Sequence, residues 1–271
     1  MKFPSLLAEI LLAIWATAFP AARQSQHLGP FSVMSPLGIN KTLGARGDED
    51  DGTDWAGAVY TAPPAGTKFT GVSAWFTVPE SSFPATYPDY EAGIVLSIGI
   101  DGRTYTDAML TAGVHISVTY DGKTEYVPHW QWWPTTWVHK LYNELEVRPG
   151  DEFYVAIQTT SPTTASILFE NRSTGKRYSA NASPSDPATG GVLRGENALW
   201  IAGNFERLAD PVPPSNFGQI KFIDMWAETG SEGWIDSSGA DLLDFHFLER
   251  QIASAERVSP TEIGITYVGP K

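Results

Sequence analysis

Cysteine is absent from this 271-residue chain, so neither a disulfide bond nor a thiolate is available to stabilise it or to react. Basic residues are scarce, because 18 Lys and Arg stand against 31 Asp and Glu and give a formal net charge of −13 at pH 7. Such a charge repels a phosphate backbone, and we therefore expect no nucleic-acid partner. With 42% hydrophobic residues, a chain of this length can form a large core by packing alone.

No apolar run reaches the ~20 residues that a membrane-spanning helix needs. The longest, Ile10 to Phe19, follows Lys2 and lies among small residues suited to signal cleavage. We expect residues 1–22 to be a signal peptide and the processed protein to be secreted, without a membrane partner; the alternatives are an uncleaved anchor or a buried N-terminal helix. Residues 23–53 are polar and Gly-rich and end in an acidic run, which predicts a linker or short pro-segment.

Three Asn-x-Ser/Thr triplets agree with a secretory route. They place candidate N-glycosylation sites at Asn40, Asn171 and Asn181. A triplet of this kind is a weak signal by itself, because it also occurs by chance.

Helical periodicity is nearly absent from residues 54–271. Eleven short runs rich in β-branched and aromatic residues alternate with turn dipeptides such as Asp101-Gly102, Asp121-Gly122 and Thr174-Gly175. The runs include residues 143–147, and the stretch 239–258 is ambiguous between strand and a helical turn. This pattern predicts a single all-β domain, an antiparallel sandwich or barrel.

Motifs for phosphate binding, for a GxSxG nucleophile and for metal ligation are also missing. His129 and His139 are ten residues apart, which matches no familiar zinc spacing. We therefore expect no metal and no cofactor. Paired carboxylates or a polar cluster in an aromatic cleft are the remaining kinds of site.

The segment HWQWWP, residues 129–134, is the most aromatic part of the chain. Strand side chains alternate between two faces. One face would present Val127, His129, Gln131 and Trp133, and the other Tyr126, Pro128, Trp130 and Trp132. One face should belong to the core, and the other should line a site.

Several sequence blocks occur in an order that resembles the secreted fungal glutamic peptidases, also called the peptidase A4, G1 or eqolisin family. They are DWAGAV (54–59), GVSAWFTVP (71–79), SIGIDGRTYTDAMLTAG (97–113), YVPHWQWWP (126–134), VRPGDEF (147–153), ILFENRSTGK (167–176), ENALWIAGNFE (196–206) and SNFGQIKF (215–222). The resemblance implies an antiparallel β-sandwich of the lectin-like (concanavalin A-like) type, with two packed, curved sheets.

The same resemblance implies catalysis by a glutamine and a glutamate, of which the glutamate activates a water molecule. The segments that align with these residues have Thr111 and Gly203 at the two positions, so both catalytic side chains are expected to be replaced. Tyr105 and Arg194 occupy positions where relatives are expected to have a bridged cysteine pair. A displaced dyad using Glu206 is the alternative, although an odd shift would turn that side chain to the opposite face.

The resemblance implies that the face with His129 and Gln131 lines the cleft, so Trp130 and Trp132 on the opposite face are expected in the core. His129 and Gln131 are the catalytic candidates, and the alternative is that the backbone satisfies both at a strand edge. Asp107 is a candidate ligand contact that could equally be a carboxylate in a turn. All the candidate ligand contacts are Trp133, Trp75, Trp137, Asp107 and Thr111.

The functional hypothesis is a protein of this family that has lost proteolysis. Its aromatic cleft would bind or transform a small apolar molecule, as in a cyclase or isomerase of secondary metabolism. Two alternatives stay open: an active acid endopeptidase with a peptide ligand, and a lectin-like binding protein.

Overall fold

The computed structural model describes residues 31–32, 54–84, 91–134, 138–185, 191–204, 206–207, 210–230 and 233–270. The predicted signal peptide, nearly all of the predicted linker, Asn40 and Trp137 lie outside the described residues. The part of the chain that is described contains strands and turns but no α-helix, which confirms the expected all-β class. No helix in it is long and apolar enough to span a bilayer.

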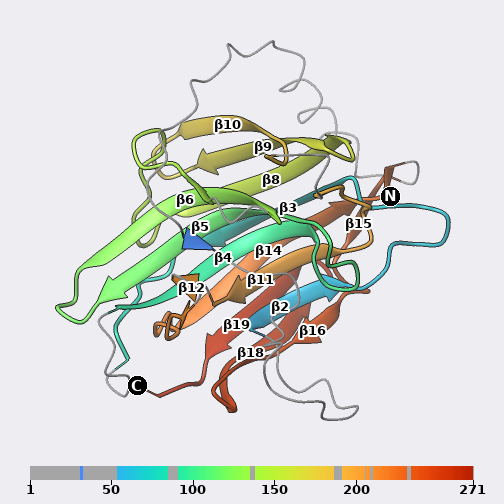
Figure 1. The fold of residues 1–271 in the computed structure, drawn as a ribbon. Helices are drawn as coiled ribbons and strands as arrows, with labels where there is room; N and C mark the ends of the chain where they lie inside the picture. The colour runs from blue at the N-terminus through green and yellow to red at the C-terminus, as the bar shows by residue number, and fades with distance from the viewer. Residues whose placement is uncertain are drawn as a thin grey trace.

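Two antiparallel sheets form the body of the fold (Figure 1). In spatial order the seven-stranded sheet contains β16 (Asp241–Leu243), β2 (Trp55–Tyr60), β11 (Ala198–Gly203), β4 (Glu91–Asp101), β5 (Met109–Thr119), β6 (Thr124–Trp133) and β7 (Val138–Lys140). The nine-stranded sheet contains β10 (Lys176–Ala182), β9 (Thr164–Asn171), β8 (Glu152–Ser161), β3 (Gly71–Thr77), β14 (Gln219–Glu228), β19 (Glu262–Tyr267), β18 (Arg250–Ser259) and β17 (Phe245–Phe247), with β15 (Trp234–Asp236) paired to β14. A small third sheet joins β1 (Phe31–Ser32), β12 (Glu206–Arg207) and β13 (Asp210–Pro211).

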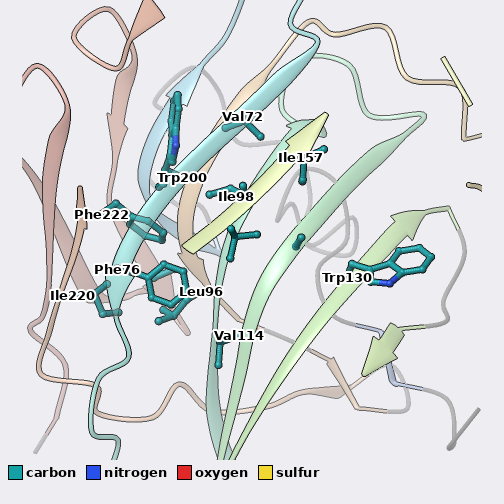
Figure 2. Packing of buried hydrophobic residues seen from close by; sticks show 14 of the residues in the cluster. Val72, Phe76, Leu96, Ile98, Val114, Trp130, Ile157, Trp200, Ile220 and Phe222 are labelled. Carbon is teal, nitrogen blue, oxygen red and sulfur yellow. The ribbon is translucent and has the colours of Figure 1, made fainter. Parts of the chain in front are cut away.

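The core fills the space between the two large sheets (Figure 2). On β4, every second residue from Ile94 to Ile100 is apolar and buried there, and the same alternation on β3 contributes Val72 and Phe76. Each strand therefore uses one of its two faces to build the core, as the twofold side-chain period requires.

Trp130 and Trp132 belong to this core, as the alternation of the aromatic segment predicts. The indole Nε1 of Trp132 donates a hydrogen bond to the Gly191 carbonyl at 2.6 Å. Trp200 on β11 similarly donates to the Ser73 carbonyl at 2.9 Å. Each indole thus combines apolar burial with a satisfied donor.

One local expectation is wrong, and one ambiguity is resolved in favour of strands. Residues 143–147 form turn and irregular structure, and Leu145 and Val147 are buried in the core from this loop. The stretch 239–258 has no helical turn but contains β16, β17 and β18. Its hairpin turns at Leu248 and Glu249, whose φ angles of 49° and 62° lie in the left-handed region. That conformation is normally signalled by Gly or Asn, and neither is present here.

A buried polar brace joins the end of β4 to the segment before β11. The Asp101 carboxylate is fully buried and accepts hydrogen bonds from the backbone N–H groups of residues 194 to 197, at 2.6 to 3.3 Å. The Asn197 amide oxygen accepts from the backbone of Arg103 and Thr104, both at 2.9 Å. Its nitrogen donates to the carbonyls of Tyr60 and Thr61, both at 3.2 Å. Both side chains therefore satisfy backbone groups that have no strand partner.

Tyr105 and Arg194 lie face to face beside this brace. The guanidinium carbon of Arg194 is 4.3 Å from the centre of the Tyr105 ring, a cation–π contact. The two positions expected to be a cysteine pair in relatives are thus adjacent in space, and a noncovalent contact joins them in this chain.

We predict that Asp101→Asn lowers the free energy of unfolding by roughly 2 to 3 kcal/mol, because an amide cannot accept all of these hydrogen bonds and turns a donor toward other donors. Urea unfolding followed by tryptophan fluorescence measures the change. Asp107→Asn is the matched control, because Asp107 is exposed in the nearby turn. An effect no larger than that of the control would show that the brace contributes little.

Candidate functional site

The outer face of the seven-stranded sheet, which points away from the core, has buried polar side chains. We call this the candidate face. Its most deeply buried polar residues near the centre of the sheet come from β4, β5 and β6 and include Ser97, Thr111, His115, His129 and Gln131. All five are at most 2% exposed, which is unusual for side chains of this kind on the outside of a sandwich.

Strand register places these side chains next to one another. Ser97 pairs with Gly113, and Gly113 pairs with His129, so the serine and the histidine flank a glycine in one cross-strand row. Thr111 pairs with Gln131 in the adjacent row on the same face. A Cβ atom on Gly113 would lie 1.8 Å from the Leu96 carbonyl oxygen, so only glycine fits between them.

Apolar side chains make up most of the rest of the candidate face. They form a second buried cluster with Trp55, Val59, Val95, Met109, Leu199, Ile201 and Val212, against which Trp133, Val138 and Leu243 pack. Asp101, at the end of β4 and paired with Met109 of this cluster, is the one buried carboxylate among the described residues, and four backbone N–H groups already donate to it. Within the described residues there is also no group of three or more His, Cys, Asp or Glu side chains placed to hold a metal ion.

Burial, and to a smaller extent the nearby Lys140 ammonium, lower the pKa of His129 to about 3. The backbone of Gly113 opposes this shift only in part. The pKa of His115 is also well below its ordinary value, mainly through burial and then through Lys140 and His129. Both imidazoles are therefore neutral near pH 7, where they can donate and accept hydrogen bonds but supply no positive charge.

Several polar atoms of the candidate face make no hydrogen bond with regular geometry within the described structure. These are Ser97 Oγ, Thr111 Oγ1 and both ring nitrogens of His129. Buried polar atoms are usually paired, since an unpaired group keeps its full desolvation cost. This part of the face is consequently suited to hydrogen-bonding a small molecule.

The structure brings some predicted site residues together. Thr111, His129 and Gln131 share the candidate face, and Trp133 packs against its apolar cluster. Ser97 and His115 were not among the predicted site residues. A signal for them exists in the sequence, because each is a polar residue directly flanked by apolar residues within a strand.

Trp75 does not belong to this site, contrary to expectation. It lies on β3 of the nine-stranded sheet, where Val72 and Phe76 point into the core and Trp75 points outward. There its ring packs on Tyr154 at 4.8 Å between centroids. Strand alternation on the other sheet thus puts Trp75 on the opposite surface of the sandwich.

Asp107 is exposed in the turn before β5, which favours the interpretation as a turn carboxylate over a ligand contact. Gly203 pairs with Trp55 and Val95, so it lies on the candidate face two strands from Thr111. Thr111 faces Gly99 of β4, four residues along that strand from Val95. Glu206 begins β12, and its side chain is not described.

The glycosylation expectation needs one correction. Asn171 is fully buried, and its amide nitrogen donates to the Glu146 carbonyl at 3.1 Å and to the Asp151 carboxylate at 2.7 Å. A glycan on that nitrogen is incompatible with these contacts. Asn181 on β10 is exposed and accessible as an acceptor.

A family model, the peptidase A4 family, matches residues 53–267. The chain belongs to the peptidase A4 family. No curated protein matches it.

Solved structures with the same fold include peptidases of this family. Scytalido-glutamic peptidase with a peptide-based transition-state analogue is 24% identical over 79% of this chain and 98% of that chain, with a TM-score of 0.65. SCP-B, an eqolisin peptidase bound to a tripeptide, is 24% identical with the same two coverages and a TM-score of 0.63. Aspergilloglutamic peptidase from Aspergillus niger is 27% identical over 65% of this chain and 99% of that chain, with a TM-score of 0.59. The expected β-sandwich of two packed sheets is confirmed.

The buried histidines of this A4 family member should make its folded state sensitive to acid. Between pH 6.5 and about 3 the unfolded chain binds a proton at His129 that the folded chain does not bind. The free energy of unfolding therefore decreases by about 1.4 kcal/mol for each unit by which the pH is lowered in this range. In His129→Phe, the stability lost between pH 7 and pH 5 should be about 2 kcal/mol smaller than in the wild type. Urea unfolding at both pH values measures the difference.

His246→Gln serves as the control, since His246 lies on β17 in the other sheet. Equal pH dependence of the wild type and His129→Phe would show that His129 is not held neutral by the fold.

Proposed function

We propose that this member of the A4 family does not cleave peptides in acid, and that its candidate face binds or transforms a small, mainly apolar molecule. The observation that supports this most strongly is that the one buried carboxylate among the described residues, Asp101, is already engaged by four backbone N–H groups. Thr111 and Gly203, where the resemblance places glutamine and glutamate, both lie on the candidate face.

Hydrolysis of a peptide needs a base that activates water. A threonine hydroxyl and a glycine offer none. His129, with a pKa of about 3, is a weak base, and protonating it costs stability in the acidic range where peptidases of this type would be expected to work. The face is therefore better suited to chemistry near neutral pH.

The apolar surroundings favour a small molecule over an extended peptide. Trp55, Trp133 and aliphatic side chains surround a few neutral hydrogen-bonding groups, a composition typical of small-molecule sites. An isomerisation or a cyclisation fits this composition, because orientation and a few hydrogen bonds can lower the barrier without a strong nucleophile. His129 and Gln131 are the polar groups proposed to act on the bound molecule.

A retained peptidase activity is the second candidate, because relatives with this fold were solved with a peptide-based transition-state analogue and with a tripeptide.

We also propose that the protein is secreted after removal of residues 1–22 and can bear a glycan at Asn181.

We predict that the purified protein does not digest denatured casein between about pH 3 and 5, because the candidate face lacks a general base. Release of acid-soluble peptides is the measurement, with an active glutamic peptidase as the positive control. The double variant Thr111→Gln with Gly203→Glu tests the two positions directly. The proposal would be contradicted if the wild type still cleaved casein after repurification and did so only at pH values where the protein is folded.

We predict that the wild type binds naphthalene, a compact apolar probe, and that Trp133→Ala weakens binding by roughly 1 to 3 kcal/mol because it removes an aromatic contact. Equilibrium dialysis at pH 7 measures the affinity. Trp75→Ala is the matched control, since Trp75 lies on the opposite surface, and it should leave the affinity unchanged. Equal losses in both variants would point to a general loss of fold rather than to this site.

A further inference from the structure

Three side chains of the candidate face have buried polar atoms that make no hydrogen bond of regular geometry among the described residues, although the Gly113 backbone contacts the imidazole of His129. They are Ser97 on β4, Thr111 on β5 and His129 on β6, and we call them the polar trio. Each is at most 1% exposed. His115 and Gln131 lie beside the trio but are not part of it.

The trio surrounds the position of Gly113. Ser97 and His129 flank this glycine in one cross-strand row, and Thr111 is two residues away on the same strand and the same face. A side chain at residue 113 would collide with the β4 backbone. The polar atoms of three adjacent strands therefore point to the same side of the sheet, around a position that has no side chain.

We propose that the polar trio hydrogen-bonds the neutral oxygen groups, hydroxyl or carbonyl, of an otherwise apolar ligand. This inference rests on the proposed function and adds to it the chemical class of the ligand and two residues, Ser97 and Thr111, that select it. The hydroxyls of both can donate and accept, and a neutral imidazole can do the same through its two nitrogens.

Charge considerations favour a neutral ligand over an ionised one. The one buried carboxylate among the described residues, Asp101, already accepts hydrogen bonds from four backbone N–H groups, so an ammonium group at the trio would have no free counter-ion. Lys140 pairs with His129 at the β7 edge, where its Nζ lies 5.8 Å from the centre of the Tyr142 ring. A ligand carboxylate at the trio would lose its hydration, and none of the three side chains of the trio is a positively charged donor that would replace it. Burying the ionised group there is therefore costly.

The unpaired state of the trio has a measurable consequence for stability. A hydroxyl that is buried without a partner destabilises the folded chain, and a structural role does not account for it. Removing it should stabilise the ligand-free protein and weaken ligand binding, an opposition that is typical of functional sites. A hydroxyl with a purely structural partner would behave in the opposite way, because its removal would destabilise the fold.

The test compares three probes that share one ring system: 1-naphthol with a neutral hydroxyl, naphthalene with none, and 1-naphthoate with a charge at pH 7. Equilibrium dialysis with the full chain gives the affinities, and thermal unfolding gives the melting temperatures. The variants are Ser97→Ala and Thr111→Val. Thr111→Ser retains the hydroxyl, and Ser179→Ala on β10 is the control in the other sheet.

We expect the wild type to prefer 1-naphthol over both other probes. Ser97→Ala and Thr111→Val should each lower the affinity for 1-naphthol by about five- to tenfold, the usual effect of losing one hydrogen bond, and leave that for naphthalene unchanged. Both variants should also raise the melting temperature without ligand. Thr111→Ser and Ser179→Ala should behave as the wild type with all three probes.

The role of the trio would be overturned if the wild type bound 1-naphthol and naphthalene equally well and only Trp133→Ala weakened binding. The proposed function would then still stand. A lower melting temperature in both trio variants would also overturn the role of the trio, because the hydroxyls would then be structural. Tighter binding of 1-naphthoate would contradict the neutral ligand class. Absence of binding by all three probes would overturn both the trio and the proposed function.

Discussion

The buried carboxylate of Asp101 is the contact on which the geometry of the candidate face depends most directly. It gathers the backbone N–H groups of residues 194 to 197, while Asn197 returns hydrogen bonds to the loop after β4 and to the end of β2. These contacts fix where β11 begins and how the chain turns from β4 into β5. Ser97, Thr111 and Gly203 lie on those same three strands, so their positions depend on a brace outside the face itself.

The two faces of the seven-stranded sheet have different roles, because the inner face builds the core and the outer face contains the candidate site. The inner residues must be apolar because they form the shared core, and Trp130, Trp132 and Trp200 meet this requirement. The outer residues do not contribute to this shared core, so their side chains can differ while the sandwich is retained. Members of the A4 family can therefore share this sandwich while the chemistry of the outer face differs between them.

Desolvation links stability and function on that face. Burial in a low dielectric keeps His115 and His129 neutral. The same burial removes water from the hydroxyls of Ser97 and Thr111, and this desolvation is not offset where they lack a hydrogen-bond partner. A ligand with neutral oxygen groups would relieve that cost, and acid would increase the cost at the histidines. The same burial therefore favours a neutral ligand and disfavours work in acid.

The sequence by itself determined the all-β class, the strand that contains HWQWWP and the burial of Trp130 and Trp132, because local turn chemistry and twofold alternation are written in neighbouring residues. Only the tertiary structure decided which strands share a sheet. It put Trp75 on the opposite surface from Trp133, buried Asn171 under hydrogen bonds, and brought Ser97 beside His129 across Gly113. The hairpin at Leu248 and Glu249 also escaped prediction, since its left-handed backbone lacks the usual glycine. Register, face and burial arise from contacts between residues far apart in the chain, and alternation within one strand cannot specify its neighbours.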